Sequence, residues 1–149
     1  MSQADDFSAR IVALARGWIG TPYRHQASCR GIGCDCLGLV RGVWRELYGD
    51  EPEAVPAYSA GWAETPARTG EPLAAAARRH LQEIDTRSLA PGDVVLFRWR
   101  SHLPAKHVGI TVSDTCMVHA QEGAAVCEVA LTSWWRRHQA YAFRFPPNR

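Results

Sequence analysis

The sequence predicts an α+β domain in which helices near the N-terminus pack on an antiparallel β-sheet. Helical periodicity marks the first part of the chain, and short β-type runs follow one another after Pro91-Gly92. Helices first and a meander of strands afterwards are typical of this class. At 149 residues the chain is expected to form one domain, residues 1–149.

The first expected element is an amphipathic helix over residues 5–18, where apolar residues recur at helical spacing. Gly17 and Gly20, followed by Thr21-Pro22, end the pattern. Residues 20–34 contain Gly, Pro and Ser without a sustained period, which predicts an ordered loop.

A second helix is expected from Cys36 onward. Asp35 is a favourable N-cap residue, and Gly49 is a natural helix stop. Small and apolar positions from Cys36 to Leu47 fall on one face of this helix. The pattern therefore places Cys36 in the first turn, with its side chain toward the protein body.

The segment 50–88 is expected to be an insertion beside the core. Residues 50–72 hold four prolines and two glycines, which predicts a long surface excursion. Residues 73–84 are alanine-rich and predict a helix.

The second half of the chain predicts five strands. Within the second of them, Val108, Ile110 and Val112 share one face, which we expect to enter the core, while His107 faces elsewhere. The five runs are residues 93–99, 107–112, 116–121, 125–131 and 141–145.

Composition excludes several classes of protein. Hydrophobic residues make up 46% and charged residues 21%, with a formal net charge of +2, so neither disorder nor a nucleic-acid partner is expected. No apolar run approaches the roughly 18 to 20 residues that cross a bilayer, so membrane insertion is not expected. The polar, acidic start lacks the features of a secretory signal, which predicts synthesis and retention in the cytoplasm unless something else carries the chain out.

Five cysteines make an odd number, so at least one is expected to be a free thiol. The pKa of a thiol falls at a helix N-terminus or beside an imidazolium, and Cys36 occupies the first of these settings. Cys34 and Cys29 lie in the loop before the helix and lack it. Cys36 is therefore the candidate nucleophile.

His107 and His119 are the candidate base and its orienting partner, because both lie in expected strands twelve residues apart. A hairpin register that pairs residue 107 with 119 or with 121 puts both histidines on one face, with Cβ atoms roughly 5 to 8 Å apart. A register offset by one residue puts them on opposite faces. The pattern permits a Cys36–His107–His119 relay without selecting among these registers.

Other interpretations of these residues remain open at this point. A lone buried cysteine is usually a small hydrophobe, and a strand histidine is more often satisfied or exposed than catalytic. Cys29, Cys34 and Cys36 with two histidines have the ligand types of a zinc site, but their spacing is irregular. The C-x-C spacing also lacks the second intervening residue of a redox dithiol. No metal and no other cofactor is expected.

Five ordered segments resemble the NlpC/P60 family of cell-wall cysteine peptidases, and more narrowly the phage-type subgroup associated with tails and gene transfer agents. The resemblance covers about residues 7–131. Its segments are GTPYRHQAS (20–28), CDCLGLVRGVW (34–44), APGDVVLF (90–97), HVGITV (107–112) and VHA (118–120).

The resemblance implies a papain-like fold in which a helix carrying the cysteine packs against an antiparallel sheet carrying the histidines. It puts Cys36 at the position of the family's nucleophile, His107 at the base and His119 at the residue that orients the base. Tyr23 falls on a tyrosine that lines the site near the oxyanion. Asp35 falls on an aspartate that some members use to recognise a free amino terminus in the peptide stem.

The sequence departs from the family pattern at two positions beside the nucleophile. Leu37 stands where many members have a serine that helps to bind substrate, and Cys34 stands where an aromatic residue is frequent. The segment 50–88 has no counterpart in the minimal domain.

The function implied by this resemblance is a peptidoglycan endopeptidase that cleaves a stem-peptide amide, D-γ-glutamyl to meso-diaminopimelate or a nearby stem linkage. The implied chemistry uses a Cys36 thiolate paired with a His107 imidazolium. The implied partner is a tail or baseplate protein of a phage-like particle, with action in the periplasm of the target cell. Two alternatives stay open: a structural adaptor of the tail tip with little activity, and an acyltransferase on the same fold.

Overall fold

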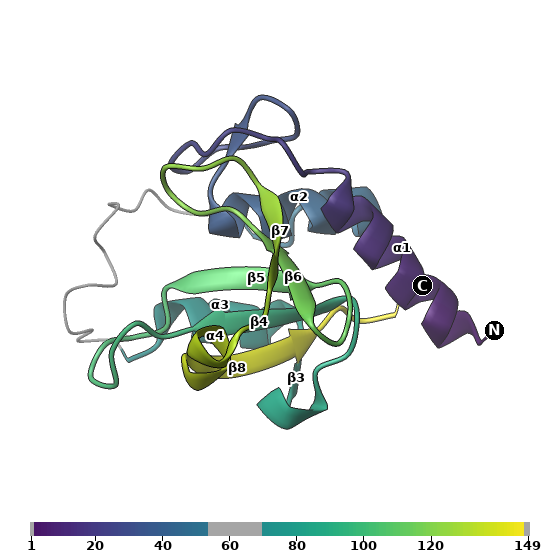
Figure 1. The fold of residues 1–149 in the computed structure, drawn as a ribbon. Helices are drawn as coiled ribbons and strands as arrows, with labels where there is room; N and C mark the ends of the chain where they lie inside the picture. The colour runs from purple at the N-terminus through teal and green to yellow at the C-terminus, as the bar shows by residue number, and fades with distance from the viewer. Residues whose placement is uncertain (1, 54–69, 148–149) are drawn as a thin grey trace.

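The computed structural model describes residues 2–53 and 70–147 and has an α+β fold, which confirms the predicted class (Figure 1). A six-stranded, wholly antiparallel sheet has the strand order β3-β8-β4-β5-β6-β7, and β1 and β2 form a separate small hairpin. The elements are α1 (Gln3–Arg16), β1 (Ser28–Cys29), β2 (Gly33–Cys34), α2 (Cys36–Tyr48), α3 (Pro72–His80), β3 (Gln82–Ile84), the 3-10 turn η1 (Thr86–Ser88), β4 (Asp93–Phe97), β5 (His107–Thr111), β6 (Cys116–His119), β7 (Cys127–Ala130), α4 (Ser133–Arg137) and β8 (Gln139–Arg144).

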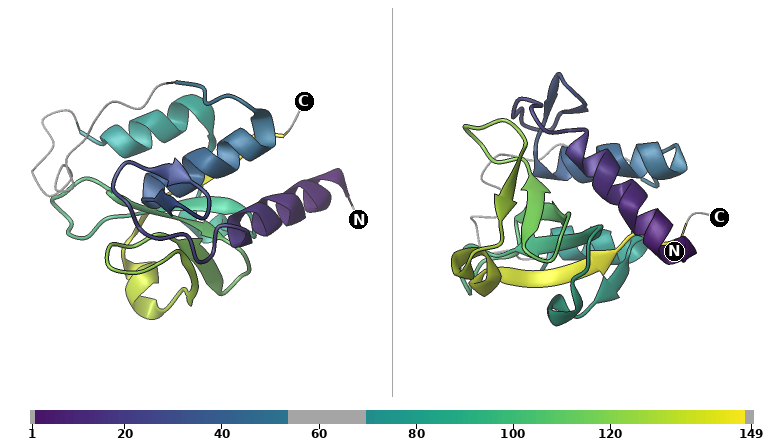
Figure 2. Two further views of the ribbon diagram at one scale, coloured as in Figure 1. Left: turned by 90° about the horizontal axis from the view of Figure 1, so that it is seen from above. Right: turned by 45° about the vertical axis from the view of Figure 1, so that its right-hand side comes forward.

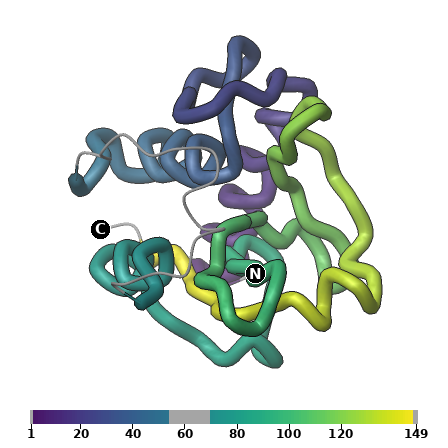
Figure 3. Tube along the Cα trace, turned by 90° about the vertical axis from the view of Figure 1, so that its left-hand side faces the viewer, coloured from purple at the N-terminus to yellow at the C-terminus, as the bar shows by residue number. Residues whose placement is uncertain are grey.

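The central strands are buried on both faces. Helices α1, α2 and α3 lie on the same side of the sheet (Figure 2, Figure 3), where Val94 and Leu96 of β4 enter the main core. On the opposite face, Val95 and Phe97 form a smaller core, against which Trp135 of α4 packs. Every residue of β4 is therefore buried, although its side chains alternate between two separate cores.

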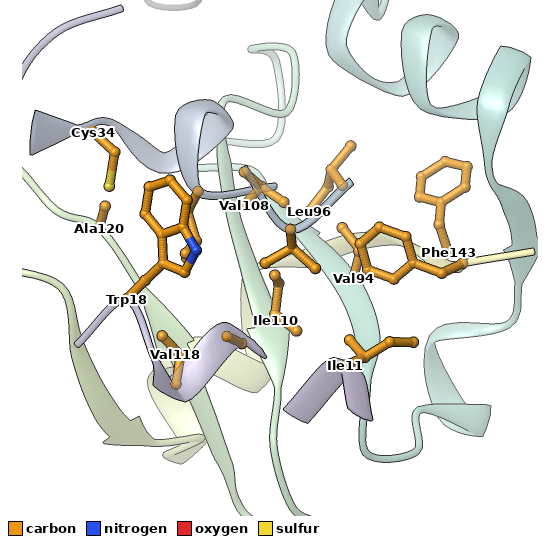
Figure 4. Packing of buried hydrophobic residues seen from close by; sticks show 14 of the residues in the cluster. Ile11, Trp18, Cys34, Val94, Leu96, Val108, Ile110, Val118, Ala120 and Phe143 are labelled. Atoms are coloured by element: carbon orange, nitrogen blue, oxygen red, sulfur yellow. The ribbon is translucent and has the colours of Figure 1, made fainter. Parts of the chain in front are cut away.

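Trp18, just after the end of helix α1, packs against helix α2. Ser2 caps α1 by accepting a hydrogen bond from the Asp5 N–H, and Trp18 follows the end of the helix with only 2% of its surface exposed. A Cβ added at Gly42 of α2 would lie 2.0 Å from the indole Cζ2 of Trp18. The close approach of the two helices therefore depends on Gly42 (Figure 4 shows Trp18 in the core).

The turn before β4 is fixed by the buried carboxylate of Asp93. It accepts hydrogen bonds from the Ala90 N–H at 2.9 Å and from Arg144 of β8 at 2.9 and 2.8 Å. The Arg144 side chain of this ion pair is partly exposed to solvent, whereas Asp93 is buried. The interaction ties the start of β4 to its neighbour β8.

The register of β5 and β6 pairs Gly109 with His119. Residue 107 consequently lies opposite residue 121, which is the second of the two registers that put both histidines on one face. The prediction that Val108, Ile110 and Val112 enter the core opposite to His107 is also confirmed.

The structure of the 50–88 region differs in part from the sequence prediction. The expected helix 73–84 is wrong in its second part, because α3 ends at His80 and Gln82–Ile84 form β3. Leu81 adopts extended backbone, and the residues after it pair with β8, so sheet pairing overrides helical propensity there. Residues 54–69 of the expected insertion lie outside the described residues.

The other expected elements agree with the structure within a few residues, whereas β1, β2 and α4 were not anticipated. Helix α4 has five residues and no side-chain cap, so it leaves no periodic signal. None of the helices in the described part of the chain has the length and apolarity needed to cross a bilayer.

Substituting Gly42→Ala tests the packing of the two helices. Alanine has the higher helix propensity by about 1 kcal/mol, but overpacking against Trp18 should outweigh it and lower the free energy of unfolding by about 1–3 kcal/mol. Urea unfolding measures the effect. The double variant with Trp18→Phe should lose less than the sum of the single variants, and a Gly42→Ala protein that is more stable than wild type would contradict the packing.

Candidate active site

The site begins at the first turn of α2, which Asp35 holds in place. Its carboxylate accepts the Gly38 N–H at 2.7 Å and the Gln26 N–H at 2.8 Å, so one buried side chain caps the helix and ties it to the preceding loop. Gln26 has a positive φ of 63°, a conformation uncommon outside glycine. The predicted N-cap role of Asp35 is confirmed.

The loop 20–34 lies against the helix through backbone hydrogen bonds. The Cys34 N–H donates to Pro22 and its carbonyl accepts from Arg24, so Tyr23 is flanked on both sides by bonds to Cys34. A Cβ at Gly38 would lie only 1.9 Å from the Ala27 carbonyl oxygen. Glycine at this position lets the loop approach the helix and carry Tyr23 to the site.

Cys34 itself is a core residue. Its side chain is fully buried, and Figure 4 shows it beside Trp18 and Ala120. It is also a free thiol. Cys34, the first cysteine of the C-x-C pair, is thus part of the hydrophobic core, unlike Cys36, which faces β5.

Cys36 lies at the start of α2 and faces β5. Its Sγ is 3.8 Å from the Lys106 carbonyl oxygen, to which the thiol donates, and it lies near the N–H of Val108. Lys106 and Val108 flank His107 in the chain. The sulfur is therefore placed against the backbone on either side of the predicted base.

The two histidines contact each other directly. Nε2 of His107 lies 2.8 Å from Nδ1 of His119, and both side chains are buried. Because this contact uses Nε2, the other ring nitrogen of His107, Nδ1, is the one left to exchange a proton with a nucleophile. The predicted pairing of His107 with His119 on one face is confirmed.

Two tryptophans that the sequence reasoning missed cover His107. Trp99 and Trp135 lie 5.4 and 5.6 Å from the imidazole centroid at small interplanar angles, and 6.0 Å from each other. The two indoles and the imidazole therefore form one aromatic cluster. Trp99 continues the alternation of β4 beyond Phe97, which pairs with His107, so this neighbour had a signal in the sequence.

Burial under these rings changes the protonation of both histidines. It is the main cause that lowers the pKa of His107 to about 3, and His119 and Lys106 act in the same direction. Burial also lowers the pKa of His119 to about 4. Both imidazoles are consequently neutral at neutral pH.

Burial also governs the thiol. It raises the pKa of Cys36 to about 12, helped by the charge of Asp35, while backbone N–H groups of Val108, Leu37 and Cys36 act in the lowering direction. Burial therefore opposes the charge of both members of the expected thiolate–imidazolium pair and favours a neutral thiol and a neutral imidazole at rest, because each charged form would lose its hydration.

Tyr23 lies beside the nucleophile. Burial raises the pKa of its phenol to about 12, and Cys36, Asp35 and Glu122 add to the shift through their negative charge. The phenol stays protonated and can donate a hydrogen bond. Both Asp35 oxygens already accept backbone N–H groups, and its predicted part in substrate recognition stays a prediction.

The cysteines and histidines that have the ligand types of a zinc site are not gathered into a metal site. Across residues 2–53 and 70–147, no group of three or more His, Cys, Asp or Glu side chains is placed to hold a metal ion.

Comparisons with known proteins identify the family that the sequence matches. The sequence model described as NlpC/P60 family matches residues 20–144. The chain is 28% identical over 140 residues to the murein DD-endopeptidase MepS/murein LD-carboxypeptidase of Escherichia coli K12, covering 93% of this chain and 63% of that protein. It is 27% identical over 124 residues to the probable endopeptidase NlpC of the same strain, covering 83% and 68%.

Solved structures agree on the fold. The structure superposes on the NlpC/p60 domain of the peptidoglycan hydrolase SagA with a TM-score of 0.61 and 24% identity, covering 93% of this chain and 98% of that chain. The chain spans less than two thirds of the length of MepS. The similarity therefore concerns only a part of that relative.

The resting protonation state can be measured through the ultraviolet absorbance of the thiolate. The difference between wild type and Cys36→Ser should stay flat through neutral pH and rise only above about pH 9, because burial holds the Cys36 pKa above that of a free thiol. A thiolate signal that is already constant between about pH 5 and 8 would show an ion pair and contradict the neutral resting form.

Proposed function

The chain belongs to the NlpC/P60 family, and from this premise we propose that it is a cysteine endopeptidase that cleaves an amide bond in the peptide stem of peptidoglycan. The observation that carries the proposal is the placement of the Cys36 thiol against the backbone that flanks His107, with His107 bonded to His119. In this proposal the nucleophile comes from α2, the base from β5 and the orienting group from β6. Hydrogen bonds join the thiol to the backbone beside the base and the two histidines to each other.

The first step forms an acyl-enzyme. Sγ of Cys36 attacks the carbonyl carbon of the stem amide while its proton passes to Nδ1 of His107. The imidazolium formed donates through Nε2 to Nδ1 of the neutral His119, which stabilises its charge. Transferring the proton during attack avoids a separated ion pair in a buried site.

Collapse of the tetrahedral intermediate breaks the C–N bond, and His107 returns the proton to the leaving amine. Water then attacks the thioester carbonyl, His107 accepts a proton from it, and the thiol of Cys36 leaves as the product acid forms. The N–H groups at the start of α2 and the phenol of Tyr23 are the donors for the oxyanion; one such donor contributes about 3 kcal/mol to stabilising the transition state.

The proposal also names the bond that is cleaved and the way in which the protein reaches the cell wall. The bond we propose is D-γ-glutamyl to meso-diaminopimelate, supported by the resemblance of the segments around Cys36 and His107 to cell-wall peptidases. The same segments support delivery by a phage-like tail, with action in the periplasm of the target cell.

Digestion of purified peptidoglycan tests the activity. Wild type should release soluble fragments whose masses identify the new amino and carboxyl ends, while Cys36→Ser should release at least about a thousandfold less, since the nucleophile is lost. EDTA should leave wild-type release unchanged. Equal release by wild type and Cys36→Ser would refute cysteine catalysis.

Cys34→Ala is the matched control for Cys36→Ala. Cys34 is buried in the core and removing its sulfur leaves the site in place, so this variant should keep most of the activity. Comparable losses in both alanine variants would refute a single nucleophile and favour a dithiol or metal site.

Sedimentation of particles tests the route. If the chain is tail-associated, antibody against it should detect it in phage-like particles purified by density gradient from the producing cells. Its absence from intact particles that contain their tail proteins would refute this part of the proposal and leave the peptidase activity untouched.

A further inference from the structure

An aromatic wall extends from the candidate base to the protein surface. We define it as Trp99, Trp134, Trp135 and His138. Trp135 contacts His107 and His119 at centroid distances of 5.6 and 5.2 Å on its inner side. On its outer side it meets Trp134 edge-to-face at 5.0 Å.

Trp134 forms the exposed end of this wall. It is 45% exposed, whereas Trp135 is only partly exposed and the histidine pair is buried. His138 stacks on one face of the Trp134 ring, with a centroid distance of 4.0 Å and an interplanar angle of 21°. His138 thus covers one face of Trp134, while nearly half of the residue's surface remains exposed.

The ring is held in a fixed orientation. Nδ1 of His138 lies 2.6 Å from the Trp134 carbonyl oxygen, and Trp99 packs at 5.8 Å from the Trp134 ring. Arg136 of the same helix donates to the carbonyl of Asp114, and the Arg98 N–H donates to the carbonyl of His138. These bonds anchor α4 to the loop before β6 and to the end of β4, so a ligand would meet a ring that is already ordered.

The size of this surface suits one small ring better than a protein. A fully covered tryptophan buries about 150–250 Å², so the exposed part of Trp134 amounts to about 100 Å². A stable protein interface needs about 800 Å² from each partner. The exposed side chains beside it on α4, Ser133, Arg136 and Arg137, are polar.

The distance between Trp134 and the histidine pair matches the distance between the cleaved bond and the sugar that carries the stem peptide. One aromatic ring separates Trp134 from His107. An extended peptide advances about 3.3–3.6 Å per residue, so a sugar that carries the stem one to three residues from the cleaved bond lies within about 11 Å of it. The apolar C–H face of a pyranose is complementary to the exposed part of the Trp134 indole.

We propose that Trp134, backed by His138, is a stacking platform for a pyranose ring of the glycan strand to which the stem peptide is attached. This inference rests on the proposed function, since it names a second part of the same substrate. The site would recognise stem peptides that are still joined to their sugar over free peptides.

Kinetics on two matched substrates test the platform. One is the free stem tetrapeptide, and the other is the same peptide joined to its disaccharide. Trp134→Ala should lower kcat/KM for the disaccharide peptide by about tenfold, the effect of one lost ring contact, and change that for the free peptide by less than about twofold. Trp134→Phe, which keeps a flat ring, should fall between alanine and wild type.

Ile19→Ala is the control, because Ile19 is exposed to the same 45% and lies at the end of α1. It should change neither substrate. An equal loss on both substrates in Trp134→Ala would mean that Trp134 acts through Trp135 on the histidine pair, and no loss on either would mean that it touches no substrate; both results overturn the platform.

Binding keeps the test independent of turnover. In the Cys36→Ser background, calorimetry should show tighter binding of the disaccharide peptide than of the free peptide, and Trp134→Ala should remove that difference. If wild type cleaves neither substrate but this difference is present, the peptidase proposal fails and the platform stands. Equal affinities in the Cys36→Ser protein overturn the platform whatever the activity.

Discussion

The site depends on one buried carboxylate with two backbone partners. Asp35 accepts from Gly38 in the helix and from Gln26 in the loop, so the first turn of α2 and the segment that carries Tyr23 cannot move apart without leaving a buried charge unpaired. Leaving such a charge uncompensated costs several kcal/mol. The position of Cys36 follows, because it is the next residue in the chain and the first of the helix.

The same carboxylate also disfavours ionisation of the neighbouring thiol. Its negative charge opposes ionisation of Cys36, and burial opposes it further, while N–H groups around the sulfur favour it. The indoles of Trp99 and Trp135 that hold His107 in place also deprive it of water. Geometry and electrostatics are coupled here, because the groups that position Cys36 and His107 also disfavour a charge on either side chain.

Local signals in the sequence predicted the parts of the site that depend on local structure. Asp35 and Gly49 bound α2, and the period-two pattern of β5 put His107 opposite its core-facing valine, so both could be predicted. Choosing between pairing 107 with 119 and with 121 required the loop between β5 and β6, which composition does not determine.

The remaining parts arise from tertiary packing. Trp135 lies on a five-residue helix without a side-chain cap, and its contact with His107 joins segments far apart in the chain. Residues 82–84 were assigned to a helix because they follow an alanine-rich run, but their pairing with β8 decides their structure. Neither contact has a local signature.

Strands β4 and β5 are buried on both faces, so the stability of the fold is more sensitive to substitution in these strands than on the surface. All residues of these strands are buried and their large apolar side chains enter one of the two cores, so a substitution there affects the stability of the fold. Helix α4 packs Trp135 on the smaller core and is anchored by Arg136 and by the Arg98 N–H, while Ser133, Arg136 and Arg137 are exposed. Exchange of these exposed side chains should therefore perturb the fold less than exchange within β4 or β5, which makes the surface of α4 the more tolerant place for engineered change.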